Sequence, residues 1–320
     1  LLVSLVSLGR SLNPRSPPRA FRDRFCATAN LWIRHALRSN VQELGIIGYD
    51  LDDSDKYMPF SLDFRIMTSL YLKKLHLCNI YIENCHMEKL FSGCQALEDL
   101  EMISCEFDGT EFSSATLKKL SIARVRFTVL EGYDRYVDGI LIKMPSLVSL
   151  QIGSVRCPKP ILVEVQTLVT ASISIDRPDY CGITFADTCD ILGTLSNVKN
   201  LELLLSGDVA LLYMLKHSPN LEKLTLMLRK RFLKGCYDME PPCEETTTPF
   251  SCEKLKKLEL ICPNGDKRVS MLVAILYANI ISPPEINIKP FRLFMVSFLF
   301  SEIAHLHAFY SLQLSCAVAL

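Results

Sequence analysis

Apolar and polar residues alternate in a recurring six-residue pattern, apolar-x-x-apolar-x-apolar, along most of this chain. The clearest copy is Leu97-Glu-Asp-Leu-Glu-Met102, and nine copies occur, starting 20 to 34 residues apart. In each copy the fourth and sixth residues alternate with their neighbours, as in a short strand with one buried face. The other eight copies begin at Val41, Leu72, Leu117, Leu147, Leu168, Val198, Leu221 and Leu255.

One copy cannot fold alone, because burying three apolar side chains contributes roughly 5 to 9 kcal/mol. Ordering ~25 residues costs about 1.5 kcal/mol for each residue. Stacked copies share their apolar faces and so form a continuous core. The pattern and its spacing are typical of leucine-rich repeats, with inserted loops in the longer copies. We therefore expect an α/β leucine-rich-repeat solenoid, a curved horseshoe with parallel strands on its concave face and helices and loops on its convex face.

The pattern divides the chain into four parts. Residues 1–30 are rich in proline and arginine and predict a flexible basic N-terminal arm. Residues 31–266 form the leucine-rich-repeat solenoid, 267–290 form a C-terminal cap, and 291–320 are an apolar tail of uncertain status.

Further elements are expected between and beyond the copies. Helix-period apolar residues and a following proline or charged turn predict several short helices. The first would cap the N-terminal end of the solenoid, with the lone Trp32 as a packing residue. The expected helices span 29–37, 86–91, 209–217 and 267–280, and an alternating run predicts an edge strand over 285–289.

Charge argues against two classes of partner. The 35 Lys and Arg residues balance the 35 Asp and Glu residues, so no global field would attract nucleic acid or an anionic membrane. The longest uncharged run after Arg292, over 293–301, is far shorter than the ~20 residues that cross a bilayer. We expect neither nucleic acid nor a membrane as partner.

The chain has 13 cysteines, no C-x-x-C pair and no N-x-S/T sequon. This usage is typical of buried thiols in a reducing compartment, which favours the cytoplasm or nucleus. A disulfide framework or a zinc site is the less favoured alternative. An exported ligand receptor would require paired cysteines.

No motif for catalysis or cofactor binding occurs: the phosphate-cradling, dinucleotide, nucleophile-elbow and zinc-helix patterns are all missing. An acidic stretch from Asp50 has Asp55 and Ser61 where a calcium loop needs Gly and Glu. His305 and His307 could share one face of a strand, but no further ligand is near them in sequence. We expect a non-enzymatic protein without cofactor or metal.

The third and fifth residues of the copies should point away from the core, on the concave face. This mixed-charge ladder suits recognition of a folded protein, and the alternative is that it only keeps the solenoid soluble. The candidate protein-binding residues are Glu43, Lys74, His76, Asp99, Glu101, Lys119, Ser121, Ser149, Gln151, Asn200, Glu202, Lys223, Thr225, Lys257 and Glu259.

Several stretches resemble plant F-box proteins with leucine-rich repeats. Leu90-Phe-Ser-Gly-Cys-Gln-Ala-Leu-Glu-Asp-Leu-Glu-Met102, followed by Cys105, is similar to their serine-glycine-cysteine-proline, leucine-glutamate-x-leucine repeat. Residues 113–120, 218–224 and 32–36 are similar as well, and the stretch from Leu255 to Ile288 resembles the FBD-type end of that family.

The resemblance implies the substrate receptor of an SCF-type ubiquitin ligase, in which an F-box binds a Skp1-like adaptor and the repeats hold the target. Residues 1–30 are too short and too rich in proline and arginine for a three-helix F-box. We therefore expect adaptor binding only if an F-box is supplied upstream. The alternatives are a repeat-only scaffold and a truncated gene product.

Overall fold

The computed structural model describes residues 2–6, 19–48, 60–127, 140–153, 160–175, 194–205, 215, 218–228, 252–266, 268–280 and 284–290.

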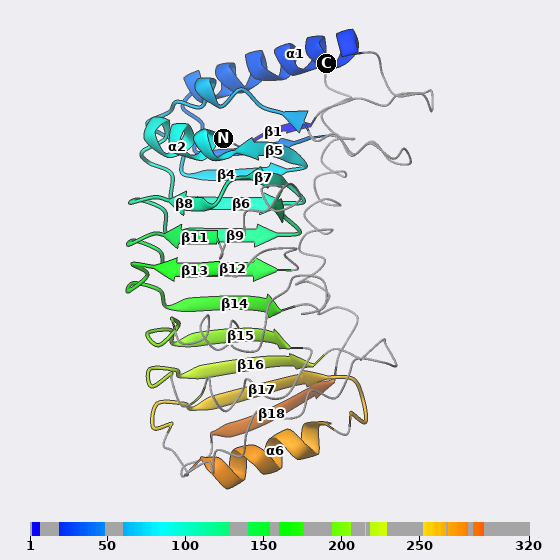
Figure 1. The fold of residues 1–320 in the computed structure, drawn as a ribbon, viewed down its shortest axis with the longest axis vertical. Helices are drawn as coiled ribbons and strands as arrows, with labels where there is room; N and C mark the ends of the chain where they lie inside the picture. The colour runs from blue at the N-terminus through cyan, green and yellow to red at the C-terminus, as the bar shows by residue number, and fades with distance from the viewer. Residues whose placement is uncertain are drawn as a thin grey trace, which may run out of the picture.

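The main element of these residues is an open, parallel sheet of eleven strands, stacked along the long axis of the molecule (Figure 1). Each of the nine sequence copies supplies one strand, in chain order, and β1 and β18 lie at the two edges. The strands are β1 (Leu2–Val6), β2 (Glu43–Ile47), β4 (Lys74–Cys78), β6 (Asp99–Ile103), β9 (Lys119–Ala123), β12 (Ser149–Gly153), β14 (Thr170–Ile175), β15 (Asn200–Leu205), β16 (Lys223–Leu228), β17 (Lys257–Cys262) and β18 (Glu285–Pro290).

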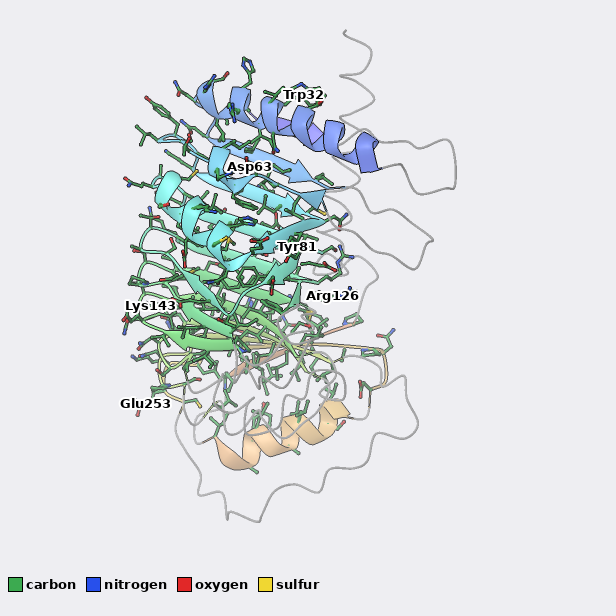
Figure 2. All side chains as sticks on the ribbon, turned by 45° about the horizontal axis from the view of Figure 1, so that its top comes forward. Trp32, Asp63, Tyr81, Arg126, Lys143 and Glu253 are labelled. Atoms are coloured by element: carbon green, nitrogen blue, oxygen red, sulfur yellow. The ribbon has the colours of Figure 1, made fainter. Side chains whose placement is uncertain are left out.

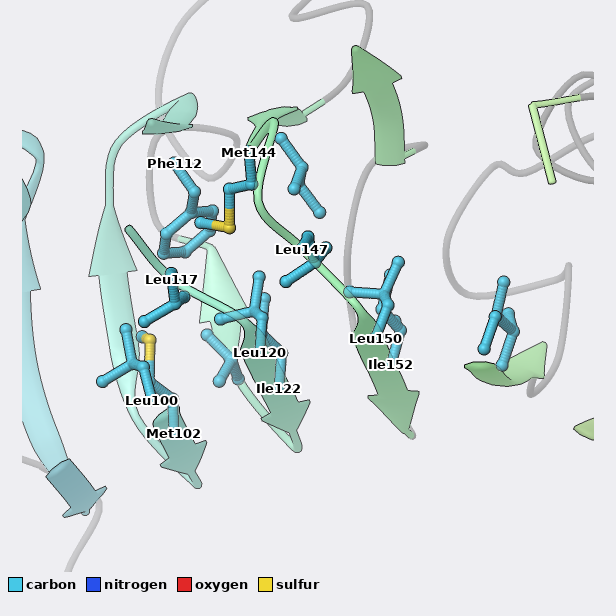
Figure 3. Close-up of a cluster of buried hydrophobic side chains, with 14 of the residues drawn as sticks. Leu100, Met102, Phe112, Leu117, Leu120, Ile122, Met144, Leu147, Leu150 and Ile152 are labelled. Carbon is cyan, nitrogen blue, oxygen red and sulfur yellow. The ribbon is translucent and has the colours of Figure 1, made fainter. Parts of the chain in front are cut away.

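The register keeps equivalent residues of the copies side by side. Leu100 of β6 pairs with Leu120 of β9, which in turn pairs with Leu150 of β12. Figure 3 shows these leucines pointing to one side of the sheet, into the core. All three are almost fully buried. Since each buried leucine contributes roughly 1.5 to 3 kcal/mol, the stacking of neighbouring copies stabilises what a single copy cannot.

Among the described residues up to Val163, short parallel strands form a second layer on the core side of the large sheet, where the prediction placed helices and loops. Alternating apolar residues such as Phe107 and Ile142 make these segments strands, and they pack their apolar faces into the same core. One small sheet contains β3 (Phe60–Ser61), β5 (Ile80–Glu83), β7 (Glu106–Asp108) and β10 (Arg126–Phe127), and the other contains β8 (Glu111–Ser113), β11 (Ile140–Lys143) and β13 (Pro160–Val163).

Polar pairs join neighbouring strands of the first small sheet. The Tyr81 hydroxyl donates to Asp108 at 3.2 Å, and Arg126 donates to Glu106 at 3.1 Å. Burial and the nearby carboxylates raise the pKa of Tyr81 to about 12. Tyr81 and Arg126 lie along this side of the stack in Figure 2.

Helix α1 (Arg19–Arg38) lies at the N-terminal end of the stack, as expected, but it begins ten residues earlier than the predicted helix at residue 29. It packs Ile33, Ala36 and Leu37 into the core, which is the i, i+3, i+4 spacing of an amphipathic helix. Trp32 is 51% exposed, so its prediction as a packing residue is wrong.

Residues 1–30 are not uniformly a flexible arm, because α1 includes residues 19–30 and β1 pairs in parallel with β2. The edge next to β2 is therefore occupied by a strand and not by the helix. The four-part division of the chain stays a prediction.

The other helices that the described residues form are α2 (Asn84–Gly93), the 3-10 turn η1 (Phe64–Ile66) and α6 (Arg268–Asn279). Helices α2 and α6 and strand β18 confirm the predicted helices over 86–91 and 267–280 and the strand over 285–289. None of the helices in the described ranges is long and apolar enough to cross a membrane.

Some predictions lie outside the described residues. They include the helix over 209–217 apart from Leu215, the acidic stretch from Asp50, His305 and His307, and the apolar tail 291–320.

Candidate protein-binding surface

The third, fifth and seventh residues of the copies lie on the face of the large sheet opposite the core, because side chains alternate along a strand. We call this the ladder face, and it includes the equivalent positions of β18. All fifteen residues predicted from the sequence lie there, in rows set by the register. Lys74, Lys119 and Asn200 are exposed, and most of the others are half-buried.

Two of the fifteen are buried, contrary to the expectation of an outward polar ladder. Thr225 is 8% exposed and Glu259 is 7% exposed. They lie next to each other on β16 and β17. The face is therefore not uniformly solvated, and its C-terminal half differs from its N-terminal half.

Charges of alternating sign form one row of the N-terminal half. Glu43, Lys74, Asp99 and Lys119 lie side by side on β2, β4, β6 and β9. Opposite charges on adjacent strands stabilise a sheet by roughly 0.2 to 1 kcal/mol for each pair. The sequence copies predicted that these four residues lie on one face of the sheet. The parallel register places them side by side on neighbouring strands.

His76 lies between two carboxylates in the next row. Its Nδ1 is 2.5 Å from Glu101 Oε2, and its Nε2 is 3.4 Å from Glu43 Oε1. The hydrogen bond with Glu101 raises the pKa of His76 above its usual value, against the effect of burial, and the charges of Glu43 and Asp99 add to the rise. Burial raises the pKa of Asp99. The surroundings of His76 therefore favour its protonated, charged form.

Glu259 is surrounded by three lysines in the C-terminal half. Lys223 and Lys257 approach its carboxylate to 3.3 Å, and Lys289 of β18 approaches to 3.2 Å. Burial opposes ionisation of Glu259, but these three hydrogen-bonded lysines outweigh it and lower the pKa. Neighbouring Glu202 has a raised pKa, mainly because of burial.

The seventh position of the copies was missed by the sequence prediction. Leu204, Met227 and Ile261 form an apolar cluster there, separate from the main core and buried. Ser174 continues this row, and its buried hydroxyl has no hydrogen-bond partner among the described residues. The signal was present in the sequence, because the alternation continues past the sixth residue in these copies.

The prediction also left out ladder-face residues in two strands. The sixth copy places Thr170 and Ser172 on β14, and β18 places Glu285 and Asn287 beside Lys257 and Glu259. Strand β18 carries no six-residue copy.

One group of possible metal ligands lies away from the ladder face, at the start of α2. Ligand atoms of Glu83, Cys85 and His86 lie within 4.8 Å of one another. The backbone N–H of Glu83 donates to His86 Nδ1 at 3.1 Å, and the ring stacks on Phe64. In a neutral ring this bond leaves the proton on Nε2, the atom that faces Glu83, so a metal there would have to break the helix cap.

Six cysteines of the described ranges are free thiols. Cys78, Cys94, Cys105, Cys252 and Cys262 are buried, and Cys85 is exposed. Burial raises the pKa of Cys94 to about 11 and that of Cys105 to about 12. The five buried cysteines agree with the prediction that most cysteines of this chain are buried thiols, and Cys85 does not.

Comparison with known proteins finds relatives of one kind. The chain is 26% identical over 198 residues to a putative F-box protein of Arabidopsis thaliana, a match that covers 57% of this chain and 39% of the relative. It is 29% identical over 220 residues to a putative F-box/FBD/LRR-repeat protein of that plant, covering 58% of this chain and 42% of the relative.

A third Arabidopsis protein, an F-box/FBD/LRR-repeat protein, is 28% identical over 177 residues, covering 54% of this chain and 37% of the relative. No protein-family model matches. The matches span less than half the length of each curated relative. They confirm the resemblance to plant F-box/FBD/LRR-repeat proteins and are consistent with a protein-interaction role.

Proposed function

We propose that this chain is a leucine-rich-repeat solenoid that binds a folded protein partner through its ladder face. The main observation is the in-register row of charges of alternating sign on β2 to β9, with the half-buried His76 held between Glu43 and Glu101. Partly buried charges in fixed positions cost less entropy to order at an interface than free surface side chains do. They select a partner of complementary charge.

The proposal extends to the role of the partner as a target for ubiquitin ligation. The names of the three relatives include an F-box, and two of them include FBD and LRR repeats. In this proposal the chain provides the target-recognition part of an SCF-type receptor, and a Skp1-like adaptor binds through an F-box upstream of the repeats. The partners are proteins, and the chain itself is not an enzyme.

The first experiment reverses three charges of the ladder face. A Lys74→Glu, Asp99→Lys, Glu101→Lys variant should lose the proteins that the wild-type chain captures from a plant extract, as read by quantitative mass spectrometry. A control variant carries Lys118→Glu, Glu98→Lys and Glu253→Lys, with the same charge changes in the turns before β9, β6 and β17. Lys118 and Glu98 form an ion pair at 2.7 Å, which the swap preserves.

The control should keep its captured proteins, and both variants should keep the circular dichroism spectrum of the wild type. If the face variant still captures the proteins, or if both variants lose them equally, the ladder face is not the binding surface.

The second experiment tests the ligase role with a purified plant Skp1-like adaptor. The chain joined behind the F-box of one of the relatives should bind the adaptor and a captured protein together, in one complex on size-exclusion chromatography. The chain without that F-box is the control and should not bind the adaptor. If the fused chain binds the adaptor but never together with a captured protein, the ubiquitin-ligation role is wrong.

A further inference from the structure

A shallow pocket lies between the last turns of α1 and the η1 segment, at the N-terminal end of the stack. Its volume is about 230 Å³. Figure 2 labels Trp32 on α1 and Asp63, the residue before η1. Helix α1 contributes Arg34, Leu37 and Arg38 to the lining, η1 contributes Arg65 and Ile66, and Thr68 follows η1.

Three arginines line this pocket, and the carboxylate of Asp63 is bound to one of them. Asp63 accepts hydrogen bonds from Arg65 Nε at 2.8 Å and Arg65 Nη2 at 3.0 Å. The hydrogen bond from Arg65 lowers the pKa of Asp63, and the charge of Arg34 contributes to the same effect. Asp63 therefore stays ionised and holds the Arg65 guanidinium in place.

The pocket keeps an excess of positive charge after this pairing. Within the described part of the chain, neither Arg34 nor Arg38 forms an ion pair with a carboxylate. They lie four residues apart on one face of α1, where like charges repel and destabilise a helix by roughly 0.2 to 0.5 kcal/mol. Three arginines and one aspartate leave a formal charge of about +2. Arginine side chains form strong, paired hydrogen bonds with anions such as phosphate.

The helix dipole explains only part of this arrangement. A cation in the last turn of a helix stabilises it by roughly 0.3 to 1 kcal/mol, which accounts for Arg38. It does not account for Arg65, which comes from another element and is fixed at the same pocket by Asp63. Binding sites are typically concave, with a few polar side chains from different elements directed at the same space. The arginines of α1 and η1 are arranged in this way.

We propose that this pocket binds a phosphate monoester, at a site separate from the ladder face. A phosphate monoester carries about −1.5 to −2 charges at pH 7 and three acceptor oxygens, which matches the excess charge of the pocket. A single carboxylate would neutralise only half of it. Planar guanidinium groups bind phosphate through paired hydrogen bonds, which favours arginine over lysine at such a site. The Thr68 side chain and the buried edges of Leu37 and Ile66 complete the lining.

The experiment measures anion binding to the full chain by isothermal titration calorimetry, at constant ionic strength. The probes are inorganic phosphate and O-phosphoserine, with chloride and serine as blanks. Both phosphates should bind saturably with one site per chain, and an Arg34→Gln, Arg38→Gln variant should bind them at least about tenfold more weakly. Because both arginines are exposed and glutamine is a good helix former, the variant should fold.

Lys254→Gln is the matched control, because it removes one exposed positive charge near β17, at the other end of the stack. It should leave phosphate binding unchanged, and both variants should keep the wild-type melting temperature within a few degrees. Tighter binding of O-phosphoserine than of inorganic phosphate would identify a phosphorylated side chain as the source, and equal binding would identify the phosphate group alone.

Wild-type chain that binds neither phosphate, or a double variant that binds as well as the wild type, overturns the proposal. Loss of binding in Lys254→Gln to the same extent as in the double variant also overturns it, since the effect would then follow net charge and not the pocket. None of these outcomes depends on the ladder face.

Discussion

The Nδ1 atom of His76 on β4 lies 2.5 Å from Glu101 Oε2 on β6, directly across the strand pair. Because the hydrogen bond with Glu101 raises the pKa of His76 above 6.5 in the folded chain, protonation favours the fold. The contribution of protonated His76 to the free energy of unfolding is fully present below about pH 6.5, the pKa in the unfolded chain. It is lost as the pH rises through the pKa in the folded chain.

We expect a Glu101→Gln variant to lower the pKa of His76, measured by NMR titration of the ring protons. His86 is the internal control, because burial lowers its pKa and Glu101 is not among the causes. A wild-type His76 that titrates at or below its usual value would contradict the hydrogen bond with Glu101.

The lysines around Glu259 predict the opposite dependence on pH. The pKa of Glu259 is lower in the folded chain than in the unfolded chain. The ionised carboxylate therefore contributes to the free energy of unfolding above about pH 4.5, the pKa in the unfolded chain. This contribution is lost as the pH falls through the pKa in the folded chain. Glu259→Gln should lower the free energy of unfolding by about 1 to 2 kcal/mol at pH 7. Urea unfolding at pH 7 and pH 3 measures this, and the difference between the variant and the wild type should shrink at pH 3.

Glu253→Gln is the control for that measurement, because Glu253 is exposed in the turn before β17 and should change stability by less than about 0.5 kcal/mol. An equal loss in the two variants would show that the three lysines do not stabilise the carboxylate.

At Gly109 an added methyl group would collide with the aromatic part of the core. A Cβ there would lie 2.5 Å from Phe107 Cζ and 2.7 Å from Asn84 Oδ1. Phe107 is fully buried and stacks on Phe112 at 4.4 Å between ring centroids, so it cannot move aside without disturbing the aromatic cluster. Gly109→Ala should therefore lower the free energy of unfolding by about 1 to 3 kcal/mol, measured by urea denaturation.

Gly153→Ala provides the comparison, since its new Cβ would come no closer than 4.0 Å to Ala123 Cβ. It should change stability by less than about 0.5 kcal/mol. If Gly109→Ala is tolerated as well as Gly153→Ala, the packing of Phe107 against the turn is looser than the structure shows.

The cysteines predict an order of reactivity. Cys85 is exposed, whereas burial raises the pKa of Cys94 to about 11 and that of Cys105 to about 12, which keeps both as unreactive thiols. Iodoacetamide at pH 8 should label Cys85 within minutes and leave Cys94 and Cys105 unlabelled until urea is added, as read by mass spectrometry. Labelling of Cys105 at the rate of Cys85 in the native chain would contradict its burial. Failure of these three to label in urea without reductant would support the exported, disulfide-bonded alternative.

The strands of the large sheet were predictable because their signal is local. In each copy the apolar residues at the fourth and sixth positions, such as Leu100 and Met102, can be buried only if the segment is a strand with one apolar face. The same alternation identified the fifteen ladder-face residues. It also extends to Leu204, Met227 and Ile261, which the six-residue pattern left out.

The second layer was not predictable in the same way. Strands such as β7 and β10 have two or three residues, too few for a period to be read, and they form only because equivalent segments of neighbouring copies pair with them. The start of α1 at Arg19 was missed because residues 1–30 are rich in proline and arginine, a composition that predicted a flexible arm.

The sequence by itself determined the repeat, the strand in each copy and the side of each strand that faces the core, because alternation along one strand decides burial. Only the tertiary structure decided which residues meet across strands: His76 with Glu101, Glu259 with its lysines, and Arg65 with the end of α1. His76 and Glu101 are 25 positions apart, and Lys223 and Lys289 are 36 and 30 positions from Glu259. These contacts depend on the register and on the lengths of the inserted segments. No local pattern contains that information, since loop length changes the neighbours of a residue without changing its own strand.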